Sequence, residues 1–413
     1  MIAALCAAAV PAAHAAFMPR TSPCMPPEEM AGITGALPTA FLPPSYAKAS
    51  LLAISEPWMA YAENSENGAA LKLKNRASGS VETLGRLRED AVLLLDGSNV
   101  ICLESNWQSN TLRIYSDGAP AYAHVFEPPV SGARKEPFHN VLCGPMLLLE
   151  DGLLLLLSKD GMLYACGADG SGLHRVADTT IADFVYYGGM IYFANMDDTV
   201  TYKNVYNETD DEYSDEIYPK LYRMKLDGSG QERLTDLGVW GLASQGPVIL
   251  YQNIDEAFVF LTNVLVSPRF LSGPLWRYDA ETGEHRALGI EAERYIPTPY
   301  GLAVWYNEYC LDPFNIDRAD LILHDYDGNP LYRLDAGVVE LLCDGCAAAE
   351  GVLEFFGFNW YPMMLWSRGH ADSFDAGGEY DEFVFTTVPL DGSPKTGGMP
   401  EVPGWVEEED GWE

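Results

Sequence analysis

Four stretches in the second half of the chain combine aromatic side chains with carboxylates, a pairing suited to binding. They span residues 195–219, 253–273, 306–318 and 358–380. Aromatic rings stack on the apolar faces of sugars and peptide side chains, and carboxylates accept hydrogen bonds from OH and NH groups. For any single residue a local core that holds its own loop is the alternative, but for the set we favour binding. The candidate ligand-binding residues are Tyr202, Tyr206, Tyr213, Phe270, Tyr306, Tyr309, Trp360, Tyr361, Trp366 and Arg368.

The first stretch is also a weak candidate for a metal site, because Ca²⁺ prefers carboxylate oxygens. Its candidate ligands are Asp210, Asp211 and Asp215. Such closely spaced acids repel one another without a counterion, so we expect a solvated, mobile loop. We predict no cofactor, with Ca²⁺ as the alternative that a calcium-dependent melting temperature would reveal.

The common catalytic motifs are missing from this sequence. It contains no G-x-S-x-G, H-E-x-x-H or P-loop pattern, and its seven histidines have no metal-ligand spacing. His139, His174 and His324 are predicted to be strand or turn residues. Glycosidases place two carboxylates across a pocket, and the 60 acidic residues do not single out such a pair. A carbohydrate-active hydrolase or lyase that uses carboxylates of these stretches is therefore the alternative function.

Cysteine chemistry is not indicated either. Cys343 and Cys346 form a C-x-x-C motif without the helix whose N-terminus redox activity needs, and without the second C-x-x-C of a zinc site. A local disulfide and two core thiols both remain open. Cys102, Cys143 and Cys166 lie in or beside apolar runs, where a buried, inert thiol is expected.

The elements that must position these residues are short β-hairpins. Apolar and aromatic runs of strand length are joined by Gly-Gly, Asp-Gly and related pairs, which is the sequence signal for hairpins. Residues 181–237 show two such hairpins in succession. No stretch keeps apolar residues at i, i+3, i+4 and i+7 over three turns, so we predict an all-β protein.

Two series of turn pairs alternate along the chain, seven in each. The first-turn pairs are Glu56-Pro57, Asp96-Gly97, Asp151-Gly152, Gly188-Gly189, Gln245-Gly246, Tyr300-Gly301 and Glu350-Gly351. The second-turn pairs are Ser78-Gly79, Asp117-Gly118, Asp169-Gly170, Asp227-Gly228, Thr282-Gly283, Asp327-Gly328 and Asp391-Gly392. Their spacing is near the propeller repeat of about 40–50 residues. We predict one β-propeller with seven four-stranded blades, six or eight blades being the alternatives. Radial repetition also protects strand edges.

The best-defined blade resembles a known family. The segments IYFANMDD at 191–198, LYRMKLDGSG at 221–230 and RLT at 233–235 are similar to bacterial propellers related to the YWTD repeats of lipoprotein receptors and to TolB-type periplasmic propellers. The resemblance implies an extracytoplasmic recognition domain of unassigned function, and it carries no catalytic residues with it. Blades of 55 or more residues depart from the compact repeat of that family.

Those long blades place the candidate residues on one face. In a four-stranded blade, the connections between strands two and three share a face with the blade-to-blade connections, while the hairpin turns lie on the opposite face. The four aromatic and acidic stretches are such connections in blades four to seven. Long loops on a rigid scaffold concentrate binding functions. We therefore predict a non-catalytic recognition propeller for a peptide, protein or glycan.

The flanking segments suggest export. Residues 1–16 are apolar and offer an A-x-A cleavage site at Ala13-His14-Ala15, so they are predicted to be a signal peptide. Residues 17–46 form a Pro-rich linker, 47–398 the propeller and 399–413 an acidic tail. The outermost strand of blade seven is expected to be short, missing or contributed by the segment before Ala47.

The charge of the chain limits its partners. With 60 acidic and 25 basic residues the formal net charge is −35, which disfavours nucleic acid and anionic membranes. Beyond the predicted signal no apolar run reaches the length of a membrane span, so no membrane insertion is expected. We expect an extracellular or cell-envelope monomer.

Overall fold

The structure, a computed structural model, consists of strands β1 to β28, and its described residues contain no helix. The all-β prediction is therefore confirmed for this part of the chain. The described residues are 45–48, 52–55, 57–63, 69–87, 91–105, 110–126, 145–158, 160–207, 212–254, 273–292, 294–298, 301–307, 319–334, 343–349, 352–359, 371–375 and 382–389.

The first two sheets are four-stranded, antiparallel and ordered as in the chain. Unit one contains β2 (Leu52–Ser55), β3 (Trp58–Glu63), β4 (Ala70–Asn75) and β5 (Val81–Arg86). Unit two contains β6 (Ala91–Asp96), β7 (Asn99–Ser105), β8 (Asn110–Ser116) and β9 (Ala119–Val125). Each strand pairs with the next one in sequence, as hairpins joined by tight turns require.

Unit three gains a strand from the beginning of the described chain. Its own strands are β10 (Met146–Glu150), β11 (Leu153–Leu157), β12 (Leu163–Gly167) and β13 (His174–Arg175). The additional strand β1 (Ser45–Lys48) pairs with β10 in the register Ser45↔Leu149 to Lys48↔Met146. The N-terminal strand therefore joins unit three. The suggestion that it completes the last unit is wrong.

One seven-stranded sheet holds units four and five. Its strands are β14 (Ile181–Tyr187), β15 (Met190–Asn207), β16 (Glu212–Lys225), β17 (Glu232–Gln245), β18 (Val248–Ile254), β19 (Gly273–Asp279) and β20 (His285–Ala292). Strand β17 serves both units, because Arg233 pairs with Tyr222 of β16 whereas Ala243 pairs with Leu250 of β18. Its first part is thus the last strand of unit four, and its second part is the first strand of unit five.

The last two sheets are four-stranded. Unit six contains β21 (Arg294–Thr298), β22 (Gly301–Asn307), β23 (Ala319–His324) and β24 (Pro330–Leu334). Unit seven contains β25 (Cys343–Ala349), β26 (Val352–Asn359), β27 (Ala371–Asp375) and β28 (Glu382–Pro389). The strand order in unit seven is β25-β26-β28-β27, so the short edge strand comes from the predicted loop 358–380.

Thirteen of the fourteen predicted turn pairs lie between consecutive, hydrogen-bonded strands, as predicted. The exception is Asp391-Gly392, which follows β28 and lies outside the described residues. It was predicted to join the last two strands of unit seven, and this is wrong, because β28 pairs with β26 and with β27, both of which precede it. The C-x-x-C motif lies in β25 and not at a helix, as expected.

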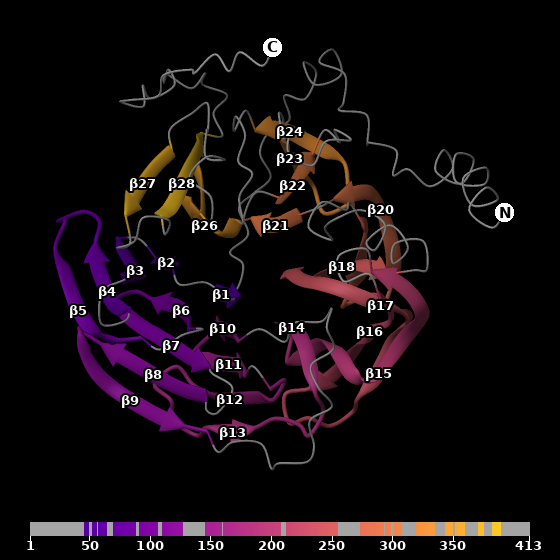
Figure 1. The fold of residues 1–413 in the computed structure, drawn as a ribbon, viewed down its shortest axis with the longest axis horizontal. Helices are drawn as coiled ribbons and strands as arrows, with labels where there is room; N and C mark the ends of the chain where they lie inside the picture. Colours follow the sequence, from indigo (N-terminus) through magenta and orange to yellow (C-terminus); the bar gives the residue numbers. More distant parts are fainter. Residues whose placement is uncertain are drawn as a thin grey trace.

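Successive units follow one another around a common centre, with β10 and β14 near it and β9 and β13 at the periphery (Figure 1). Packing between neighbours involves several of the second-turn glycines. A Cβ at Gly228 of unit four would collide with the carbonyl oxygen of Val176, which follows β13 of unit three. Gly328 of unit six meets the carbonyl of Leu288 on β20 of unit five in the same way. Both glycines also have positive φ, a backbone conformation that favours glycine. Their turns therefore require glycine for two reasons, the backbone conformation and the close contact with a carbonyl group.

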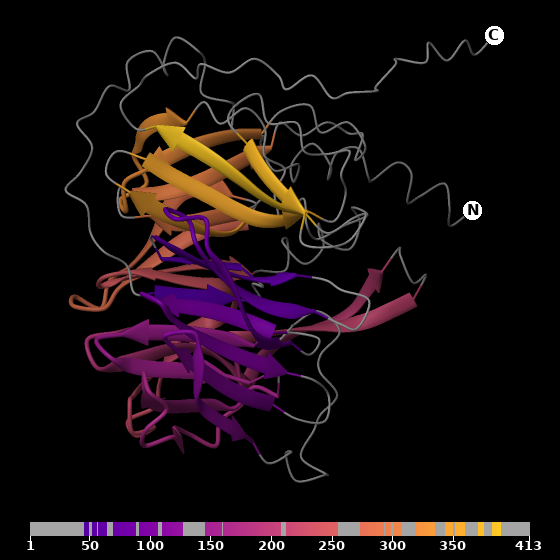
Figure 2. The same ribbon diagram turned by 90° about the vertical axis from the view of Figure 1, so that its left-hand side faces the viewer.

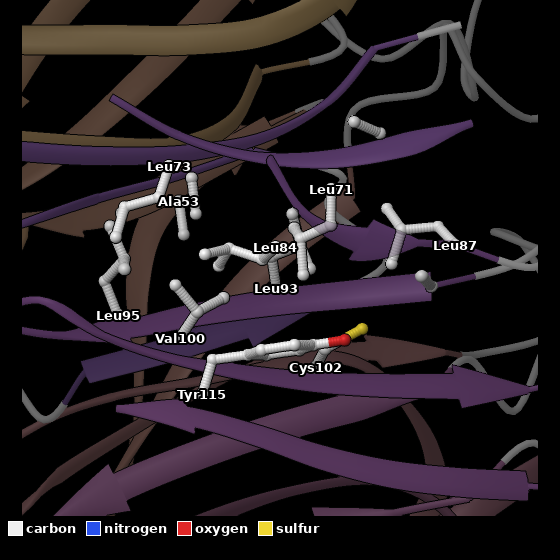
Figure 3. Packing of buried hydrophobic residues seen from close by; sticks show 13 residues of the cluster. Ala53, Leu71, Leu73, Leu84, Leu87, Leu93, Leu95, Val100, Cys102 and Tyr115 are labelled. Atoms are coloured by element: carbon white, nitrogen blue, oxygen red, sulfur yellow. The ribbon is translucent and has the colours of Figure 1, made fainter. Parts of the chain in front are cut away.

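The hydrophobic core is divided into layers between consecutive units. One layer joins Leu73 and Leu84 of unit one to Leu93, Val100 and Tyr115 of unit two (Figure 3). Comparable layers lie between units two and three, three and four, four and five, and five and six. Units two to five therefore each have two apolar faces, which explains why their strands read as continuous apolar runs.

Candidate functional site

Most of the predicted ligand-binding residues lie outside the described residues. This applies to the following predicted ligand-binding and metal-binding candidates: Phe270, Tyr309, Trp360, Tyr361, Trp366, Arg368, Asp210 and Asp211. Their assignment stays a prediction. The other candidates, Tyr202, Tyr206, Tyr213, Asp215 and Tyr306, lie in strands whose backbone is described.

The predicted loop 195–219 is largely a two-stranded β-ribbon. Residues 199–207 of β15 and 212–219 of β16, which we call the ribbon, pair from Thr199↔Pro219 to Asn207↔Glu212. Tyr206 and Tyr213 are register partners near its end, and Tyr202 pairs with Glu216. The prediction that this stretch is a loop connection is wrong for the paired residues, because a bulged register lets the hairpin pairing of unit four continue into the acidic sequence. Figure 2 shows the ribbon, in rose, projecting from the body.

An ion cluster fixes the base of the ribbon. The carboxylate of Asp198 accepts hydrogen bonds from Lys220 Nζ at 2.7 Å and from Tyr222 Oη at 2.6 Å. Arg233 lies 3.7 Å from the same carboxylate. These donors hold the pKa of Asp198 below its ordinary value. Asp198 occupies the register shift between Asn195 and Thr199, so it stabilises the bulge from which the ribbon starts.

Beside this base, β17 carries two exposed apolar residues that sequence reasoning missed. Leu237 is 40% and Trp240 41% exposed, and among the residues with described side chains the only other large exposed hydrophobics are Val81 and Val125. Trp240 pairs with Gln252 near the start of unit five's first strand. The sequence offered one signal, the flanking glycines Gly238 and Gly241.

The backbone that presents Trp240 is held from both sides. The next residue, Gly241, has φ +63° and accepts a hydrogen bond through its carbonyl from the hydroxyl of Tyr295 in unit six. The backbone N–H of Leu242 donates to the carboxylate of Asp183 in unit four at 2.9 Å. Both contacts fix the bulge between Trp240 and Ala243. An exposed indole on a fixed backbone is pre-organised for binding.

A shallow depression of about 400 Å³ lies at the opposite end of β15. It is lined by Tyr187, Gly188, Met190, Tyr192, Arg223, Lys225, Gly230, Glu232 and Ala280. Met190 begins β15 at the first-turn side, and the ribbon is the far end of the same strand. The depression therefore lies on the turn face, away from the face predicted to bind.

Two of the three charged side chains that line this depression, Arg223 and Glu232, are bound to each other. Arg223 donates through Nη2 and Nε to Glu232 at 2.6 and 2.8 Å, and through Nη1 to the hydroxyl of Tyr278 in unit five at 3.2 Å. The hydrogen bond to Glu232 raises the pKa of Arg223. Arg223 thus connects units four and five at this depression.

Carboxylate-pair chemistry is not supported at this depression, because Glu232 is its one acidic lining residue and is bound to Arg223. No group of three or more metal-ligand side chains occurs among the residues with described side chains. The alternative hydrolase or lyase function, which concerns the opposite face, stays a prediction. The described residues contain no helix with the length and apolar character needed to cross a membrane.

Comparison with known proteins leaves the family open. No protein-family model and no curated protein matches the chain. A crystal structure of polysaccharide lyase Uly1 is similar with a TM-score of 0.46 and 8% identity, over 83% of this chain and 90% of that chain. The β-propeller domain of the Trilobed protease from Pyrococcus furiosus gives 0.44 and 11%, over 75% and 91%. Oligogalacturonate lyase in complex with manganese gives 0.41 and 10%, over 84% and 91%. At this level of similarity none of them carries an argument about function.

Proposed function

We propose that this chain is a non-catalytic recognition protein, exported from the cytoplasm, built as a single seven-bladed β-propeller. It binds a peptide, protein or glycan through the face from which the ribbon projects. The observation that carries the proposal is Trp240, a 41% exposed indole on a backbone fixed by Asp183 and Tyr295.

The propeller architecture is supported by the units themselves. Units one to seven would be the seven blades, since core layers lie between consecutive sheets from unit one to unit six and the order of the units around the centre follows the chain (Figure 1). The shared strand β17 then forms the usual passage from the edge of one blade to the inner strand of the next.

The position of Trp240 supports binding more than folding. A large apolar side chain that contributed mainly to the core would be buried, as Tyr192 and Tyr251 are. Aromatic anchors of this type account for most of the binding energy at interfaces. Leu237, three residues earlier in β17, is a second exposed apolar side chain, at 40%.

The test is a screen of glycan and peptide arrays with the whole chain, followed by affinity measurements on Trp240→Ala. We expect a loss of about 30-fold in affinity, corresponding to about 2 kcal/mol for an aromatic hot spot, with an unchanged melting temperature. The matched control is Val125→Ala, which removes a 63% exposed apolar side chain from β9. Equal effects of the two substitutions on affinity, or unfolding of Trp240→Ala with affinity retained, would overturn the proposal.

A further inference from the structure

We propose that the outer edge of β16 in the ribbon binds an extended, basic segment of a partner protein as an added β-strand. This inference rests on the proposed function and names the chemistry of its partner. Strand addition to an exposed edge is a common mode of peptide recognition, in which backbone hydrogen bonds provide affinity and side chains provide selectivity.

The edge becomes free where β17 leaves β16. The described pairs between these strands are Lys220↔Gly238, Tyr222↔Arg233 and Arg223↔Glu232. Beyond Gly238, β17 pairs with β18 of unit five instead. Among the described strands, residues 212–217 of β16 thus pair with β15 alone, and no described strand lies along their opposite edge.

The ribbon has only two strands, without a third strand beside it among the described residues. An isolated two-stranded hairpin is only marginally stable in water, and three strands are normally needed. The base is fixed by Asp198 and by the burial of Tyr218, whose side chain packs against Gly238. An added strand would continue the position that β17 occupies up to Gly238. Residues 212–217, six positions of β16, correspond to a segment of about 20 Å.

The charges on this strand select the occupant. Residues 212–219 contain the carboxylates Glu212, Asp215 and Glu216 and no Lys or Arg. A second copy of the chain would bring the same acids to the edge and a net charge of −35, so self-pairing is disfavoured. A glycan offers no backbone ladder for a strand edge. A segment that alternates Lys or Arg with β-forming residues satisfies both the ladder and the charge.

Apolar contact is available at the base of the same edge. Leu237 immediately precedes Gly238, the point at which β17 departs, and is 40% exposed. An apolar residue at one end of the added segment would bury this side chain. The expected partner is therefore an extended segment with an apolar end and a basic alternating remainder.

The experiment uses the whole chain and a synthetic peptide of about ten residues that alternates Lys with Val or Thr after an N-terminal Leu. Matched peptides carry Glu in place of Lys, or Pro in place of every Val and Thr, which removes backbone donors while keeping the charge. We expect binding of the Lys peptide, weakening with added salt, and at least tenfold weaker binding of both matched peptides.

The matched protein variants change the net charge equally at two places. Asp215→Lys with Glu216→Lys alters the ribbon edge, and Asp178→Lys with Glu284→Lys alters exposed sites elsewhere. We expect the first pair to weaken Lys-peptide binding at least tenfold and the second to change it less than twofold. Asp215→Asn with Glu216→Gln should reproduce the loss if the Lys variant does not fold.

Several results would overturn this inference. The first is that the Lys peptide does not bind at millimolar concentration. The second is that the Pro peptide or the Glu peptide binds as well as the Lys peptide. The third is that both charge variants lose the same affinity for the Lys peptide. Array ligands that depend on Trp240 but not on the ribbon edge would leave the proposed function intact while rejecting the added strand. Array ligands whose binding depends neither on Trp240 nor on the ribbon edge would reject both the proposed function and the added strand.

Discussion

The carboxylate of Asp183 accepts a hydrogen bond from the backbone N–H of Leu242 at 2.9 Å, and this bond joins the first strands of units four and five. The two residues are 59 positions apart, and both lie where a strand register shifts. A charged acceptor therefore satisfies a backbone donor that the β-ladder leaves free at the bulge.

Replacing Asp183 with Ala should lower the free energy of unfolding by about 1–3 kcal/mol, because the Leu242 N–H loses its charged acceptor. Asp183→Asn keeps an acceptor oxygen and should cost less. Urea unfolding of the two variants measures the difference. If the Ala and Asn variants lower the free energy of unfolding equally little, the bond between the units contributes little to stability.

Replacing Gly228 with Ala should destabilise the fold more than replacing Gly79. Both glycines have nearly the same φ, +77° and +75°, so both substitutions impose the left-handed backbone cost of about 1–2 kcal/mol. Only Gly228 also meets a neighbouring backbone atom, the carbonyl oxygen of Val176, whereas Gly79 has open space. Thermal unfolding of the two variants isolates the contact between units three and four. Equal melting temperatures would show that the turn moves freely.

Stability should fall as the pH is lowered from about 7.5 to 5.5, because His324 resists protonation in the fold. Its side chain is 4% exposed, and burial lowers its pKa, although Asp325 and the hydrogen bond to the carbonyl of Gly328 act in the opposite direction. With a depressed folded pKa, the unfolded chain binds the proton first, so the contribution is full above the unfolded pKa of about 6.5 and declines below it. Chemical unfolding across this range measures the slope.

The control for this pH dependence is His324→Gln, which removes the titrating group. It should lower stability at every pH but flatten the slope between about pH 7.5 and 5.5. An unchanged slope in the variant would assign the pH dependence to other groups.

Cys102 and Cys166 should resist alkylation in the folded protein. Burial raises the pKa of the Cys102 thiol, and it raises the pKa of Cys166 to about 11. Few thiolates therefore form at about pH 8, and the thiols are shielded as well. Peptide mapping after iodoacetamide treatment should find both unmodified in buffer and modified in denaturing urea. Labelling of either residue in buffer would show that its layer of the core opens.

Hairpins were predictable from the sequence because their information is local. Asp117-Gly118 and Asp227-Gly228 specify a turn through backbone conformation alone, and the apolar runs on each side then pair with the nearest available strand. The continuous apolar character of β10 and β11 likewise indicates a sheet buried on both faces before any partner is known.

Tertiary structure decided the features that depend on distant partners. No sequence feature near Ser45 predicts that β1 pairs with β10, which lies about a hundred residues later. The acidic run after Asn207 did not predict the ribbon, because charge is a poor guide to strand pairing at an edge. Trp240 resembles any other strand tryptophan in the sequence. Its exposure follows from the course of β17 between two units and from the contacts of Gly241 and Leu242 with units six and four. Turn chemistry is fixed by φ and ψ at single residues, whereas exposure and strand order are fixed by which surfaces remain after all the sheets have packed.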